Sequence, residues 1–129
     1  MRGLFLSLSF AALLSACAGN PFNAPALQPG ASRQQVIERM GPPTRVVPVA
    51  GGERLQYSLQ PFGREAWMVD LDPSDRVVSA RQVLNTVSFS RIEPGRWTRN
   101  DVEREFGPPA RIDAVASWNG RVMTYYWRD

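Results

Sequence analysis

The chain contains no histidine and no lysine, since all fifteen basic residues are arginine, and it has a single cysteine, Cys17. The lack of histidine and lysine excludes the commonest general bases and Schiff-base chemistry, and leaves the serines without an activating partner. One cysteine excludes an intramolecular disulfide and, without histidine, a Cys/His metal site. The composition therefore predicts a protein that is not an enzyme and holds no metal or cofactor.

Charge and size set further limits on function and fold. The formal net charge is +3, the acidic residues are interspersed, and no run of five or more arginines occurs. This pattern predicts no nucleic-acid partner. With 129 residues and 43% hydrophobic composition, the chain has the size of one small globular domain.

The N-terminus has the pattern of an export signal. A positively charged start precedes an apolar stretch, 4–14, which is shorter than the roughly 20 residues that a membrane-spanning helix needs. We therefore expect residues 1–16 to be a signal peptide. Residues 17–28, rich in alanine, proline and asparagine, are expected to form a flexible tether.

The tetrad Leu14-Ser15-Ala16-Cys17 resembles the bacterial lipobox. The resemblance implies cleavage before Cys17 and acylation of that residue, and several acyl chains anchor a protein stably in a membrane. By the same resemblance, Ala18 implies transfer to the outer membrane, with the folded part facing the periplasm. The inner membrane is the alternative location, and an ordinary signal peptide that contains a cysteine is the alternative motif.

The most informative feature is an internal repeat, with a long first copy, 29–93, and a shorter second copy, 94–129. Each copy has a Pro-Gly pair, a capped helix with an apolar i, i+4 pair, and a Gly-Pro-Pro segment. The matching residues are Gly30, Ser32, Val36, Met40, Gly41, Pro42 and Pro43 in the first copy, and Gly95, Thr98, Val102, Phe106, Gly107, Pro108 and Pro109 in the second. From Ser32 and Thr98 onward the two copies are 66 residues apart.

Each copy predicts a short helix followed by a β-hairpin. Ser32 and Thr98 begin capping boxes, and Gly41 and Gly107 supply a left-handed residue after the helix. We expect two-residue hairpin turns at Gly51-Gly52 and Asn119-Gly120. These turns join strands 44–50 and 53–60 in the first copy, and strands 110–118 and 121–128 in the second.

The first copy continues with two further predicted strands, 66–72 and 76–84, which the second copy lacks. The last strand of the second copy therefore pairs with the first copy's sheet or with another chain, which leaves the oligomeric state open. We expect an α+β fold with short helices on one face of a single antiparallel sheet. Tyr125 and Trp127 are expected on a buried face of the last strand.

These features together resemble the SmpA/OmlA (BamE) family of small outer-membrane lipoproteins. The lipobox, the helix start at 29–32, the stop at 40–43, Tyr57 and the strand-turn-strand at 71–77 carry the resemblance, which covers 28–82. It implies an SmpA/OmlA-like domain over 29–129 and a non-enzymatic accessory role beside barrel-assembly components. The partial second copy departs from the family pattern and resembles the duplicated fold of proteinaceous β-lactamase inhibitors.

A candidate contact site precedes the second helix. Arg96, Trp97 and Arg99 are residue types that favour protein interfaces and lipid head groups, so they are predicted to contact a partner or the membrane. The alternative interpretation is that Trp97 packs as a hydrophobic staple on the helix that Thr98 caps.

Three acidic residues, Asp70, Asp72 and Asp75, are spaced as in a calcium loop. Asp75 stands where such a loop needs glycine, and Arg81 stands where it needs a bidentate glutamate. An Asx-type turn at the end of a strand is the better interpretation.

Two functions fit the sequence. The first is a lipid-anchored scaffold or accessory factor in outer-membrane protein assembly or envelope integrity, with outer-membrane lipid and envelope proteins as partners. The alternative is a periplasm-facing inhibitor or binding module for a soluble enzyme, which the inhibitor-like duplication suggests.

Overall fold

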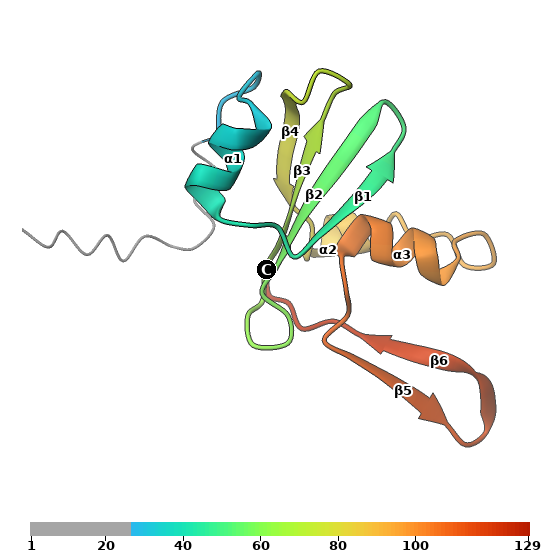
Figure 1. Ribbon diagram of the computed structural model, residues 1–129. Helices are drawn as coiled ribbons and strands as arrows, with labels where there is room; N and C mark the ends of the chain where they lie inside the picture. The colour runs from blue at the N-terminus through green and yellow to red at the C-terminus, as the bar shows by residue number, and fades with distance from the viewer. Residues whose placement is uncertain (1–26) are drawn as a thin grey trace, which may run out of the picture.

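The computed structural model describes residues 27–129, so the predicted signal peptide, Cys17 and most of the tether lie outside the described residues. Within these described residues, three helices and six strands follow one another, arranged as Figure 1 shows. Their bounds are α1 Arg33–Met40, β1 Arg45–Val49, β2 Gly52–Ser58, β3 Ala66–Leu71, β4 Val77–Gln82, α2 Thr86–Phe89, α3 Arg99–Phe106, β5 Arg111–Val115 and β6 Trp118–Thr124. The predicted α+β class is confirmed.

Both predicted capping boxes are present. The Ser32 hydroxyl accepts from the Gln35 backbone N–H, and the Gln35 side chain accepts from the Ser32 N–H at 2.8 Å. Thr98 and Asp101 form the same reciprocal pair at the start of α3, where the Asp101 carboxylate accepts from the Thr98 N–H at 2.7 Å. Each box satisfies two backbone donors that the first turn of a helix leaves unpaired.

Gly41 and Gly107 end α1 and α3 with nearly the same backbone geometry. Their φ angles are both 80°, as predicted, but their ψ angles are −172° and −175°. The expected left-handed helical conformation is therefore wrong in ψ, because each glycine precedes a proline, which disfavours the helical regions for the residue before it. This combination of angles is accessible almost only to glycine.

The first repeat builds a four-stranded antiparallel sheet in the order β1-β2-β3-β4. The β1–β2 turn lies at Ala50-Gly51, one residue before the predicted position, since Val49 pairs with Gly52. The turn between β3 and β4 is the predicted Asx-type turn, in which the Asp72 carboxylate accepts from the Ser74 and Arg76 backbone N–H groups at 2.8 and 3.1 Å.

The expectation that both helices lie on one face of one sheet is wrong. Helix α1 packs on the face that carries Leu55 and Tyr57, whereas α3 packs on the opposite face, against Arg54 and Gln56 (Figure 1). Arg54 is 6% exposed and Gln56 is fully buried. Strand β2 is therefore covered on both sides, and its polar residues are buried because α3 supplies their hydrogen-bond partners.

The second repeat forms a separate two-stranded sheet, β5-β6, so the prediction of a single sheet is also wrong. The turn lies at Ala116-Ser117, because Val115 pairs with Trp118. Asn119 and Gly120 were the predicted turn, but they belong to β6 beside a bulge that shifts the register between Ala114 and Val115. A bulge inserts unpaired residues into one strand, which displaces the turn along the sequence.

The tandem helix-plus-hairpin repeat is confirmed. Helices α1 and α3, strands β1 and β5, and strands β2 and β6 each begin 66 residues apart and have equal lengths within each pair. The short helix α2 was not predicted; the Asn85 side chain caps it by accepting from the Ser88 N–H at 2.8 Å. Within residues 27–129 no helix is long and apolar enough to cross a membrane.

Candidate functional site

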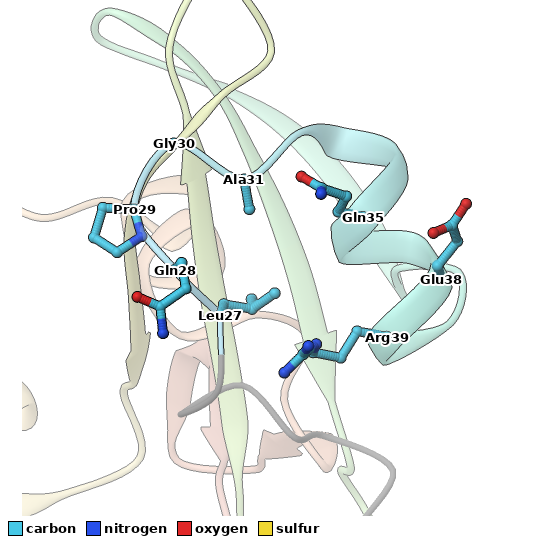
Figure 2. A pocket seen from close by; sticks show the side chains of 8 residues that line it. All are labelled: Leu27, Gln28, Pro29, Gly30, Ala31, Gln35, Glu38 and Arg39. Atoms are coloured by element: carbon cyan, nitrogen blue, oxygen red, sulfur yellow. The ribbon is translucent and has the colours of Figure 1, made fainter.

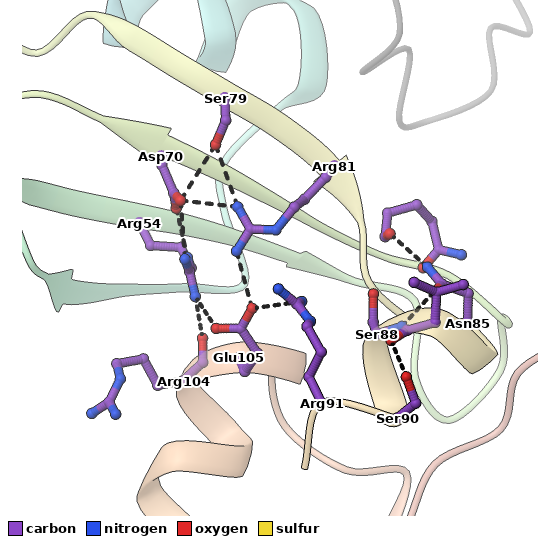
Figure 3. Close-up of polar contacts among 12 residues, drawn as sticks. Arg54, Asp70, Ser79, Arg81, Asn85, Ser88, Ser90, Arg91, Arg104 and Glu105 are labelled. Atoms are coloured by element: carbon purple, nitrogen blue, oxygen red, sulfur yellow. Dashed lines mark hydrogen bonds and ion pairs between the residues drawn. The ribbon is translucent and has the colours of Figure 1, made fainter. Parts of the chain in front are cut away.

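A network of four charged side chains joins the two repeats. Arg54 and Asp70 come from β2 and β3, Arg81 from β4, and Glu105 from α3. Each arginine contacts both carboxylates: Arg54 Nε lies 2.5 Å from Asp70 and its Nη1 lies 3.0 Å from Glu105, and Arg81 lies 3.0 and 3.1 Å from the same two residues (Figure 3). We call these four residues the charge network.

The charge network holds its carboxylates ionised. Burial opposes ionisation of Asp70, but hydrogen bonds from Arg54 and Arg81 outweigh it and lower the pKa of the carboxyl. Burial likewise opposes ionisation of Glu105, and hydrogen bonding to Arg81 and the charge of Arg54 lower its pKa. A general acid needs a raised pKa, so this arrangement favours attachment of α3 to the sheet over proton transfer.

Backbone carbonyls at the end of α3 complete this interface. Gln56 donates from Nε2 to the carbonyls of Glu103 and Arg104 at 2.9 and 3.0 Å. Arg54 also donates to the Arg104 carbonyl, at 3.0 Å. The last carbonyls of a helix lack intrahelical partners, so β2 caps α3 with its polar face. The buried Oε1 of Gln56 has no hydrogen-bond partner among residues 27–129.

The sequence did not predict the charge network or this cap. Arg54 and Glu105 are 51 residues apart, and no local sequence pattern relates them. Only the docking of α3 brings these residues together.

The three aspartates considered as a calcium loop do not converge on one site: Asp70 binds arginines and Asp72 caps a turn. Among residues 27–129, no group of three or more potential ligands could hold a metal ion.

The predicted contact residues have different surroundings. Trp97 is half-buried and its ring lies 6.2 Å from that of Phe106 between centroids, so it packs on the helix that Thr98 caps, as the alternative interpretation predicts. Arg96 is exposed and pairs with Glu93 at 2.6 Å, and Arg99 is exposed and pairs with Glu103 at 2.9 Å. A partner or membrane contact through these arginines stays a prediction.

A hollow of about 730 Å³ lies beside α1, between the helix and the segment that precedes it. Arg39 extends from α1 across this hollow toward Leu27 (Figure 2). Gln35 and Glu38 of the same helix also line it. Its mixed polar and apolar lining includes Gly30, one of the matched repeat residues. The hollow therefore lies next to Leu27, the first described residue.

A more apolar groove of about 510 Å³ lies between β6 and the helices α2 and α3. We call it the β6 groove. Six of its lining residues are apolar or aromatic and the seventh is an arginine: Phe89, Ile92, Val102, Met123, Tyr125, Trp127 and Arg121. Tyr125 is half-buried, but Trp127 is 40% exposed, so its predicted burial is wrong. The residues Phe89 and Ile92 lie in and after α2, which the sequence analysis missed.

The aromatic rings around Phe89 define one wall of the β6 groove. The Phe89 ring stacks on Phe106 at 4.8 Å between centroids and lies 5.5 Å from Trp127 and 6.3 Å from Tyr125. Aromatic groups of this kind contribute strongly to protein interfaces.

Comparison of the chain with protein families, curated proteins and solved structures finds no match.

Proposed function

We propose that the chain is a lipid-anchored, non-enzymatic envelope lipoprotein that acts as a scaffold or accessory factor in outer-membrane protein assembly or envelope integrity. The observation that carries this proposal is the position of the lone cysteine, Cys17, at the end of an export signal in a Leu-Ser-Ala-Cys tetrad. Because the chain has no second cysteine, neither a disulfide nor a cysteine metal site accounts for a thiol at this position, whereas lipid attachment does.

The fold supports a binding role. The titratable side chains of the charge network are paired with one another and attach α3 to the sheet. The surface instead offers the β6 groove and large exposed apolar side chains such as Trp118 and Trp127. Exposed apolar patches beside polar rims are typical of protein-binding surfaces.

The anchor is tested by metabolic labelling with a fatty-acid analogue in a bacterial host, followed by membrane fractionation. We expect label on the wild-type protein and none on Cys17→Ser, which should be released as a soluble periplasmic form. A variant that combines Cys17→Ser with Asn20→Cys is the matched control, since it restores a thiol three residues away from the tetrad. Labelling of this control, or of Cys17→Ser, would contradict the lipoprotein assignment.

The role is tested by mild cross-linking of the native protein in envelopes, affinity capture and identification of co-purifying proteins by mass. Enrichment of barrel-assembly subunits, together with increased envelope permeability on deletion, is the expected result. Recovery of a single soluble hydrolase in a one-to-one complex that persists with Cys17→Ser would contradict the scaffold role and support an inhibitor.

A further inference from the structure

The two repeats differ at one strand edge. In the first repeat β2 is paired on both sides, with β1 and with β3. Its counterpart β6 is paired only with β5 within residues 27–129. Two-stranded hairpins are marginally stable alone, and an unpaired edge is a template for another strand. The second repeat therefore lacks a strand on the outer side of β6, where the first repeat has β3 beside β2.

The free edge can be assigned to particular backbone groups. In the first repeat the Gln56 carbonyl accepts from the Thr44 N–H at 2.7 Å, on the β1 side. In the second repeat the Thr124 carbonyl accepts from the Ala110 N–H at 2.8 Å, on the β5 side. Because backbone groups alternate in direction along a strand, those of Met123 and Tyr125 point away from β5.

The corresponding positions of β2 show the partner that such an edge accepts. Leu55 and Tyr57 are the counterparts of Met123 and Tyr125, and they pair with Val69 and Trp67 of β3. Val69 is fully buried in the core that α1 covers, and Trp67 packs against that core. An added strand beside β6 would place its alternate side chains in the β6 groove, which is apolar in the same way.

The second repeat leaves this groove partly open. Val36 of α1 is fully buried, whereas its counterpart Val102 of α3 is only half-buried and lines the β6 groove. Trp127, which also lines the groove, is 40% exposed. The apolar surface that β3 and β4 cover in the first repeat thus has no cover in the second, within the part of the chain that the structure describes.

The charge of Arg121 indicates which side chain a partner strand should carry opposite it. Arg121 lines the β6 groove and forms no ion pair with residues 27–129. Its counterpart Glu53 lies opposite Leu71 of β3. Opposite charges on facing positions of neighbouring strands attract, and like charges repel, so the residue that faces Arg121 should carry a carboxylate.

We propose that the outer edge of β6 at Arg121 and Met123, together with Tyr125 directly after the strand, binds an extended antiparallel segment of a partner protein with apolar residues at alternate positions and a carboxylate opposite Arg121. This inference rests on the proposed function for its setting, because it names the partner chemistry of the scaffold. Symmetric pairing of two β6 strands does not fit, since β6 carries Arg121 and no acidic residue. Strand addition of this kind draws affinity from main-chain hydrogen bonds and specificity from alternate side chains.

The first test uses a peptide designed on β3. A fluorescent peptide of residues 65–72 with Leu71→Glu places tryptophan, valine and glutamate opposite Tyr125, Met123 and Arg121. Its binding to the full-length protein in detergent is followed by anisotropy. We expect saturable binding that weakens about three-fold when the peptide carries Leu71→Arg instead. No binding of either peptide would overturn the proposal.

Main-chain pairing is tested on the peptide, which leaves the protein unchanged. N-methylation at the Val69 position removes a donor that faces β6, and N-methylation at the Met68 position, the matched control, removes one that faces away. We expect about ten-fold or greater loss for the first and little change for the second. Equal effects of the two methyl groups would exclude an added strand.

A charge exchange places the peptide at β6. Arg121→Glu should weaken binding of the Leu71→Glu peptide and restore binding of the Leu71→Arg peptide, whereas Arg128→Glu is the matched control and should change neither preference. Unchanged preference in Arg121→Glu would overturn the site.

A stable dimer that the peptide dissociates, measured by sedimentation, would make a second copy the occupant and contradict the proposal. Fatty-acid labelling of Cys17 is a separate measurement, so failure of the anchor and failure of peptide binding are distinguishable.

Discussion

The hydroxyl of Tyr125 donates to the carbonyl of Gly107, 18 residues earlier, at 2.7 Å. Tyr57 donates in the same way to the Gly41 carbonyl at 2.9 Å. Each tyrosine thus binds the residue that ends its own repeat's helix, and so ties the hairpin to the helix. This shared hydrogen bond is the most specific structural sign of the internal duplication.

Removal of either hydroxyl should destabilise the fold. Tyr57→Phe and Tyr125→Phe each leave a glycine carbonyl without its donor, which should lower the free energy of unfolding by about 1 kcal/mol. Burial raises the pKa of Tyr57 to about 12, so the donor persists through neutral and mildly alkaline pH. Urea denaturation followed by tryptophan fluorescence measures the effect. Tyr126→Phe is the control, and an equal loss in that variant would show that the bonds to glycine are not responsible.

The glycines themselves should not tolerate a side chain. Gly41→Ala and Gly107→Ala force alanine into a conformation with φ near 80° and extended ψ, which should cost about 1–3 kcal/mol each. Apart from its chain neighbours, a Cβ at Gly41 meets no atom of residues 27–129 within 4 Å, whereas one at Gly107 lies 3.4 Å from the Met68 side chain. The loss at Gly41 therefore measures backbone strain alone. Unchanged thermal midpoints for both variants would show that the strain is not present in solution.

The charge network predicts a pH dependence of stability. Because the pKa values of Asp70 and Glu105 are lower in the folded state, their contribution is fully present above the unfolded values near 4 and is lost as pH falls through the folded values. The free energy of unfolding should therefore decrease as pH is lowered from about 5 toward 2. Urea titrations at several pH values measure this slope.

Removal of one cation should reduce that slope. Arg81→Met deletes one partner of both carboxylates and should cost about 1 kcal/mol near pH 7, a modest value because the Arg81 side chain is 34% exposed. The loss should shrink at low pH, where the carboxylates are protonated. Arg76→Met, in the turn between β3 and β4, is the control. A loss of equal size at every pH would mean that Arg81 acts through packing alone.

Substitutions of Trp97 and Arg96 should differ in their effect on stability, because Trp97 packs on α3 whereas Arg96 is exposed. Trp97→Ala removes a ring that packs on Phe106 and should destabilise the protein by about 2 kcal/mol. Arg96→Ala removes an exposed ion pair with Glu93 and should change stability by less than about 0.5 kcal/mol. Thermal unfolding of both variants tests this, and a large loss for Arg96→Ala would contradict the assignment of Arg96 to the surface.

Local sequence patterns predicted local structure well. The capping residues Ser32 and Thr98 begin their helices where expected, and the Gly-Pro-Pro segments end them. These features depend on residues within one turn of each other, so the chain alone specifies them. The hairpin of the second repeat was misplaced because Asn119-Gly120 has the composition of a turn but occupies a bulge.

The candidate binding surface was only partly predictable. The aromatic residues near the C-terminus were noticed, but their groove also needs Phe89 and Ile92, which come from the unexpected α2 region. A signal for α2 existed in the Asn85-Thr86-Val87-Ser88 segment, because an asparagine side chain can cap a helix by accepting from the backbone N–H three residues on, here that of Ser88. The free edge of β6 could be expected from the missing strands, although its separation from the main sheet could not.

The repeat, the boundaries of α1 and α3, the strand content and the candidate lipid attachment at Cys17 follow from neighbouring residues or from a repeated spacing, so local sequence is enough to predict them. Which face of the sheet each helix covers depends instead on packing between distant segments. Alternation along β2 marks Leu55 and Tyr57 as buried but says nothing of Arg54 and Gln56. Those two are buried because α3, about 50 residues later, presents carbonyls and Glu105 that compensate the loss of water.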